Sequence, residues 1–168
     1  MEMNRPLTLV VVSILFFVSV AAVSAQLGSP FSGRLDPIAD GQGEVPPATG
    51  SGFLYSVMDY YEQGPKIMVN GTFDGLRSPA TVAHLHRATT GPDAPGGPTL
   101  GPKVFDLIVS HATTGTVNGS FWITEKQAEE IKQGWYYVQI HSEASPAGAL
   151  RSWLVQGFVD NSFFADKP

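Results

Sequence analysis

The chain contains the segment Thr81-Val82-Ala83-His84-Leu85-His86, which is typical of a β-strand. Successive side chains of a strand point to opposite faces of a sheet. Ala83 and Leu85 therefore share one face, and His84 and His86 share the other. We expect the apolar pair to face the core and the two histidines to point away from it.

A second segment also ends in histidine: Trp135-Tyr136-Tyr137-Val138-Gln139-Ile140-His141. Alternation directs Tyr136, Val138 and Ile140 toward a core and places Gln139 and His141 on the opposite face. If the two strands are neighbours, three of the chain's four histidines converge outside the core: His84, His86 and His141. A cluster of imidazoles of this kind predicts a site for copper or zinc.

The rest of the sequence favours an all-β protein, because short alternating or apolar runs are separated by clusters of Gly, Pro, Asn and Asp. We expect further strands at 52–61, 66–73, 104–109, 117–123 and 149–159. The predicted fold is an antiparallel, Greek-key-like β-sandwich. Its core should include Ile67, Val69, Phe73, Leu85, Val138 and Ile140.

One short helix is expected near 125–133. Thr124 and Gln127 fit a capping box, and Gly134 supplies a stop after a run of good helix formers. The helix delivers the chain into the second histidine strand. Two of its residues should pack inward: Ala128 and Ile131.

The first 25 residues have the features of a cleaved signal peptide. A polar start with Arg5 precedes an apolar run over 7–22, and Val23-Ser24-Ala25 suits cleavage before Gln26. The alternative is an uncleaved membrane anchor, although the run is short of the ~20 residues that span a bilayer. Cleavage leaves one domain over 26–157 and a tail over 158–168. It predicts a secreted, extracellular or periplasmic protein without membrane contact.

The composition narrows the classes of partner and site. The chain has 10 Lys and Arg against 15 Asp and Glu, and it has no basic patch, so nucleic acid is not an expected partner. It contains no cysteine, which excludes disulfides and thiolate ligands. Any metal site must therefore use imidazole and oxygen ligands. The partners we expect are a metal ion and an extracellular protein or glycan.

The histidines have a second interpretation, in which they only bond loop backbone and pin the Gly- and Pro-rich loop over 87–102 to the sheet. We expect His111, in a turn, to be exposed and outside the site. The sequence shows no Gly-x-Ser-x-Gly elbow, phosphate-binding Walker loop, His-Glu-x-x-His helix or paired-carboxylate signature. No catalytic residue is predicted.

Other residues have a functional and a structural interpretation. Glu44 could be a carboxylate ligand, and Arg151 could face the histidines; we favour a structural role for both, an ion pair in the case of Arg151. Asn70 and Asn118 match the N-glycosylation pattern on the predicted outward face. Four aromatic residues could line a carbohydrate site, although strand aromatics are more often core: Trp122, Trp135, Tyr136 and Tyr137.

Six motifs follow one another along the chain: Gly43-Glu44-Val45-Pro46-Pro47, Ser78-Pro79-Ala80-Thr81-Val82-Ala83-His84-Leu85-His86, Gly96-Gly97-Pro98, Phe121-Trp122-Ile123-Thr124, Tyr136-Tyr137-Val138-Gln139-Ile140-His141-Ser142 and Pro146-x-Gly148-x-Leu150-Arg151. As an ordered set they resemble the CHRD domain family, named from chordin. The resemblance implies a β-sandwich of exported proteins with mostly unassigned activity, and so a binding module rather than an enzyme. One departure is Ala149, where many relatives look to carry an acidic residue.

The His-x-His strand and the loop after it are also locally similar to copper–zinc superoxide dismutases, whose remaining ligands cannot be matched here. This likeness implies an alternative function, a copper-dependent oxidoreductase with superoxide-dismutase-like geometry. A third possibility is a purely structural extracellular domain whose histidines bond only backbone.

Overall fold

The computed structural model describes residues 29–38 and 49–157. The expected signal peptide, Glu44 and the tail over 158–168 lie outside these residues. Within them, no helix is long and apolar enough to cross a membrane. The elements are β1 (Ser29–Pro37), β2 (Ser51–Tyr61), β3 (Gly64–Asp74), β4 (Ala80–Arg87), β5 (Lys103–Val109), β6 (Gly115–Trp122), α1 (Glu125–Lys132), β7 (Tyr136–Ser142), β8 (Leu150–Trp153) and β9 (Val155–Gln156).

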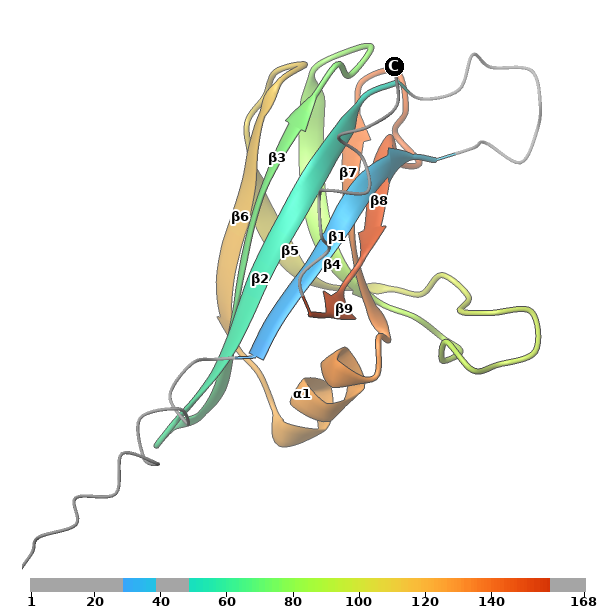
Figure 1. Cartoon of the computed structure of the whole chain (residues 1–168). Coiled ribbons are helices and arrows are strands. Elements are labelled where there is room, and N and C mark those ends of the chain that lie inside the picture. Colours follow the sequence, from blue (N-terminus) through green and yellow to red (C-terminus); the bar gives the residue numbers. More distant parts are fainter. Residues whose placement is uncertain (1–28, 39–48, 158–168) are drawn as a thin grey trace, which may run out of the picture.

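The strands form one antiparallel sheet that closes on itself (Figure 1). The order is β2-β3-β6-β5-β4-β7-β8-β1, and β1 pairs back with β2 to complete an eight-strand barrel, with the short β9 added beside β1. Within it, the order β3-β6-β5-β4 is a Greek key. The all-β antiparallel prediction is confirmed, and the sheet closes into a barrel where an open sandwich was expected. The last expected strand is interrupted at Leu154, between β8 and β9.

Two strands close the barrel because each pairs with a different neighbour along its length. β5 pairs with β4 as far as Leu107 and with β6 from Ile108 onward. β1 pairs with β2 over most of its length and with β8 at Asp36 and Pro37. Close approach of β1 to β8 requires a glycine at position 33, where a Cβ would lie 2.4 Å from the carbonyl oxygen of Trp153.

The barrel interior is filled by alternate residues of its strands. The residues expected in the core are all buried, none being more than 2% exposed: Ile67, Val69, Phe73, Leu85, Val138 and Ile140. The inward assignment of both histidine segments is therefore confirmed, and the histidines lie on the outer surface.

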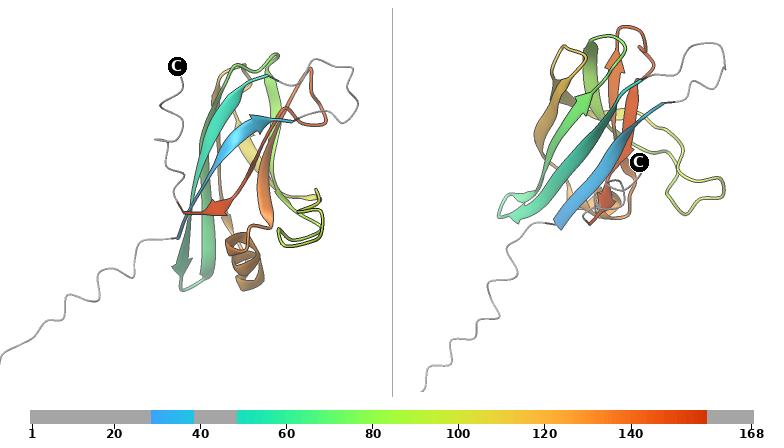
Figure 2. Two further views of the ribbon diagram at one scale, coloured as in Figure 1. Left: turned by 45° about the vertical axis from the view of Figure 1, so that its right-hand side comes forward. Right: turned by 45° about the horizontal axis from the view of Figure 1, so that its top comes forward.

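Helix α1 lies at one end of the barrel (Figure 2). The predicted capping box is present: Thr124 Oγ1 accepts from the Gln127 amide at 3.2 Å, and Gln127 Oε1 accepts from the Thr124 amide at 2.8 Å. Ala128 and Ile131 are fully buried, as expected. Gly134 has a positive φ of 79° and turns the chain into β7.

Replacing Ile140 with alanine should lower the free energy of unfolding by about 2–5 kcal/mol, because it removes buried side-chain atoms and leaves a cavity in the barrel. Chemical denaturation measures this loss. The matched control is Ile108→Ala, since Ile108 is 72% exposed on the outer face of β5 and should change stability by less than about 0.5 kcal/mol. Equal effects of the two substitutions would contradict the assignment of Ile140 to the core.

Candidate metal centre

Strands β4 and β7 are antiparallel neighbours, with His84 opposite Gln139 and His86 opposite Tyr137. This pairing brings His84, His86 and His141 together on the outer surface of the barrel. Each ring is partly buried, and one nitrogen from each lies within 4.8 Å of the others. The group could hold a metal ion.

The unpaired nitrogen of the cluster belongs to His86. Its Nδ1 lies 3.0 Å from the carbonyl oxygen of Gly101. A carbonyl only accepts hydrogen bonds, so Nδ1 carries the proton and Nε2 keeps a free lone pair. Among the described residues, this Nε2 has no hydrogen-bond partner although it is buried. A buried polar atom without a partner is costly, and it marks a place where a ligand or ion would be stabilising.

The other two rings are oriented in the same manner. His141 Nδ1 lies 2.9 Å from the carbonyl oxygen of Pro146, so its proton is on Nδ1 and its Nε2 lone pair faces the cluster. His84 directs Nε2 toward a carboxylate oxygen of Asp106 at 3.4 Å. Its Nδ1 then lies 3.2 Å from Nε2 of His141. Because His141 Nε2 accepts, His84 donates this hydrogen bond when its proton is on Nδ1, and a cation between the two nitrogens would take the place of that proton.

The electrostatic surroundings of His84 and His86 favour their neutral form. Burial lowers the pKa of His84, and repulsion from His141, Lys103 and His86 lowers it further, while Asp106 acts in the opposite direction. Burial also lowers the pKa of His86, against the hydrogen bond to Gly101. Neutral imidazole is the form that binds metal, so the site is prepared for a cation at neutral pH.

The Tyr137 ring packs against one face of the His86 ring. The two rings are stacked, with centroids 4.9 Å apart and planes 11° from parallel. The Tyr137 hydroxyl donates to the carbonyl oxygen of Gly101 at 3.0 Å and accepts from the Gly101 amide at 3.1 Å. A Cβ at Gly101 would lie 2.0 Å from the carbonyl oxygen of Arg87. The loop end that holds His86 is therefore fixed from both sides.

Arg151 lies beside the cluster without pairing to a carboxylate within the described part of the chain. Its guanidinium lies over the Tyr137 ring at 5.6 Å, and its Nε donates to Gln139 Oε1 at 3.3 Å. Gln139 also donates to the carbonyl oxygen of Ala147 at 2.7 Å. Within the described residues Arg151 is therefore held by stacking and by an amide, and its expected ion pair stays a prediction.

The remaining candidates lie away from the cluster. His111 is exposed, as predicted. Tyr136 and Tyr137 are buried and Trp135 packs against the core, but Trp122 is 51% exposed, so its assignment to the core was wrong. Asn70 is exposed and Asn118 partly exposed, directly opposite each other on β3 and β6.

Sequence reasoning missed two contributors to the site, Asp106 and Gly101. Asp106 alternates with the buried Leu107 on β5, so its outward face was readable, but its position opposite His84 depends on the register between β4 and β5. A bulge between Leu85 and His86 shifts that register. Gly101 lies 15 residues after His86, and only the path of the loop brings the two together.

A family model for the CHRD domain matches residues 37–154. The matched segment begins at the last residue of β1, includes all three histidines and ends just after β8. It spans most of the 168-residue chain. No curated protein and no solved structure matches the chain.

Replacing Tyr137 with phenylalanine should lower the free energy of unfolding by about 1–3 kcal/mol, because the Gly101 amide loses its acceptor in a partly buried position. Hydrogen exchange should show faster exchange of the Gly101 amide, and denaturation should show the loss of stability. Tyr61→Phe is the control, since Tyr61 is 47% exposed. Unchanged exchange at Gly101 would contradict the role given to the hydroxyl.

Proposed function

The chain belongs to the CHRD domain family, and we propose that it is an exported binding module that holds a copper or zinc ion through His84, His86 and His141. The observation that carries this proposal is the buried, unpaired Nε2 of His86. It faces a cluster in which His141 is also bonded through its outward nitrogen and His84 Nε2 lies 3.4 Å from a carboxylate oxygen of Asp106. In known metal sites, one nitrogen of a histidine binds the metal and the other donates a hydrogen bond to an acceptor, which fixes the tautomer of the ring.

The donor set favours copper or zinc over harder cations. Imidazole nitrogen binds both ions, whereas magnesium and calcium prefer oxygen ligands. In a tetrahedral site with metal–nitrogen distances of about 2.0–2.1 Å, ligand nitrogens are about 3.3–3.4 Å apart. The Nδ1 atom of His84 lies 3.2 Å from the Nε2 atom of His141, which is close to this spacing. Copper should bind more tightly than zinc by the usual affinity order.

The N-terminal sequence supports a location outside the cytoplasm. The apolar run over 7–22 and the small residues before Gln26 support export. In an oxidising compartment a chain without cysteine must derive its stability from the core and from any bound ion. An extracellular protein or glycan is the proposed partner, and we assign no catalytic step to the site.

Calorimetry on the metal-free domain is the test of the proposal. Copper(II) and zinc(II), each supplied as the free ion, should bind with one ion per chain. His86→Ala and His141→Ala should abolish binding, because each removes one of three ligands. His111→Ala is the matched control and should leave the affinity unchanged, since His111 is exposed in a turn outside the cluster. Binding no tighter than that of the triple-alanine variant would show that the histidines are structural.

The affinity should also depend on pH, because protons compete with the ion for the same nitrogens. The pKa values of His84 and His86 lie below the ordinary value, which is about 6.5. The affinity should therefore stay nearly constant above about pH 6.5 and fall steeply below it. Repeating the calorimetry from about pH 7.5 to about pH 5 measures this fall. A constant affinity over the whole range would mean that the ion does not bind these imidazoles.

A further inference from the structure

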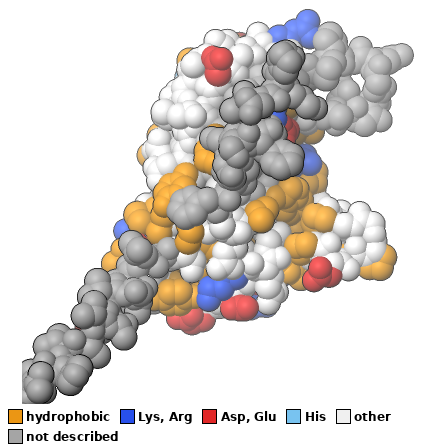
Figure 3. Space-filling view, viewed as in Figure 1, with side chains coloured by type: hydrophobic (Ala, Val, Ile, Leu, Met, Phe, Trp, Pro, Cys, Tyr) orange, Lys and Arg blue, Asp and Glu red, His pale blue; other side chains and the backbone are white. Residues whose placement is uncertain are grey.

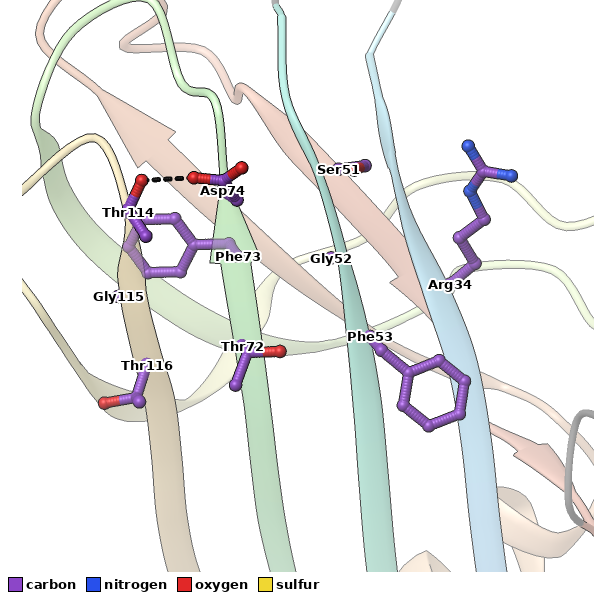
Figure 4. A pocket seen from close by; sticks show the side chains of 10 residues that line it. All are labelled: Arg34, Ser51, Gly52, Phe53, Thr72, Phe73, Asp74, Thr114, Gly115 and Thr116. Atoms are coloured by element: carbon purple, nitrogen blue, oxygen red, sulfur yellow. Dashed lines mark hydrogen bonds between the residues drawn. The ribbon is translucent and has the colours of Figure 1, made fainter. Parts of the chain in front are cut away.

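A cleft with a volume of about 750 Å³ opens on the outer face of β1, β2, β3 and β6 (Figure 4). It lies toward the ends of these strands that point away from α1 in Figure 1. A second hollow of about 390 Å³ adjoins it along the same strands. The two share three lining residues: Phe53, Thr72 and Thr116. Together they form one elongated groove, which lies four strands around the barrel from the pairing of β4 with β7.

Strand register arranges the side chains of this groove in two parallel rows. The first row crosses four strands in the order Arg34, Phe53, Thr72 and Thr116. Two residues further along each strand, the second row consists of Tyr55, Asn70 and Asn118. Side chains in such rows are close neighbours on one face of a sheet. The groove is therefore built on rigid strands, and its binding groups are held in place before any ligand arrives.

The chemistry of the groove is that of uncharged hydrogen-bonding groups around an aromatic ring. Threonine hydroxyls and asparagine amides line the groove together with Phe53, and Tyr55 is 39% exposed in the second row. At one end Thr114 donates a hydrogen bond to Asp74, which fixes the carboxylate at the rim (Figure 4). Arg34 pairs with Asp36 at 2.8 Å at the opposite rim. Among the described residues, one cation and one carboxylate line the first cleft, so these charges balance. Over the part of this surface that the grey residues leave visible, Figure 3 shows mostly backbone and side chains that are neither charged nor hydrophobic.

The topology excludes one common class of ligand. A peptide that binds a sheet as an added strand needs an edge with free backbone groups. β2 pairs with β1 and β3, β3 with β2 and β6, and β6 with β3 and β5. The groove therefore has no backbone edge to offer and must bind through side chains. The lack of net charge also disfavours an anionic ligand.

We infer that the groove binds a neutral oligosaccharide. A sugar ring has apolar C–H faces that pack on an aromatic ring, and hydroxyl groups at its edge that exchange hydrogen bonds with threonine and asparagine side chains. The elongated shape fits several sugar units in a row, and the faces of small β-barrels are used for oligosaccharides in other folds. This inference goes beyond metal binding, because it concerns the opposite side of the barrel.

The test is a titration of the isotope-labelled domain, followed by amide chemical shifts, with the hexasaccharides of cellulose, xylan, mannan, chitin and laminarin. The domain is produced in a host without N-glycosylation, since a glycan on Asn70 or Asn118 would cover the groove. At least one of these oligosaccharides should bind and shift the amides of Phe53, Thr72 and Thr116. Phe53→Ala should weaken binding by about tenfold or more, because it removes the aromatic face.

Two further variants test whether a loss of binding comes from the groove itself. Thr116→Val preserves the shape of an exposed side chain and removes one hydroxyl, so it should weaken binding without disturbing the fold. Tyr61→Ala removes an exposed aromatic ring from the far end of β2 and should leave binding unchanged. Amide spectra and thermal melting of each variant show that it is folded.

Three outcomes overturn the inference: no oligosaccharide of the panel binds, binding survives both Phe53→Ala and Thr116→Val, or a sulfated or uronic-acid polysaccharide binds more tightly than any neutral one. Metal calorimetry on the same wild-type sample separates this inference from the metal proposal. A domain that binds copper or zinc but no saccharide overturns only the groove assignment, and one that binds saccharide but no metal overturns only the metal centre.

Discussion

The antiparallel register between β4 and β7 is the constraint on which the rest of the site depends. Leu85 lies opposite Val138 in that register, and both are fully buried. Because side chains alternate, a slip of one residue would move every side chain of a strand to the other face. The histidines of β4 would then enter an apolar interior, where neutral imidazoles would lose their hydrogen bonds. Burial of the apolar side chains of β4 and β7 therefore fixes the register that keeps the imidazoles together on the outer surface.

Closure of the barrel has a second consequence, since it leaves two outer faces that differ in chemistry. The face of β4 and β7 carries imidazoles and a stacked tyrosine, whereas the face of β2, β3 and β6 carries hydroxyls, amides and aromatic rings. The strands of both faces pack their inward side chains into the same hydrophobic core. Pairing of β1 with β2 and β8, and of β5 with β4 and β6, also covers most of the strand edges through which β-proteins aggregate. A small chain without disulfides can thus present two rigid surfaces.

Much of this arrangement was readable from local patterns. Period-two alternation identified the buried row of each histidine strand, and the capping box located α1, because both signals depend on neighbouring residues only. Barrel closure was not readable, since it requires β1 and β5 to change partners along their length. The contact of Tyr137 with Gly101 depends on the path of a long loop. Trp122 is exposed because it alternates with Phe121 and the buried Ile123, which places its ring on the outer face of β6 against Tyr61.

The two interpretations of the histidines, as anchors of loop backbone and as metal ligands, are compatible because an imidazole has two nitrogens. His86 bonds Gly101 and His141 bonds Pro146 through Nδ1, and each keeps Nε2 for the cluster. The backbone bond fixes the tautomer and the plane of the ring, which a metal ligand requires. An ion held by the free nitrogens would in turn stabilise the folded chain, and with it the ends of both loops, by mass action. If the cluster holds an ion as proposed, loop order and metal affinity are coupled, and a substitution that loosens either loop should lower the affinity.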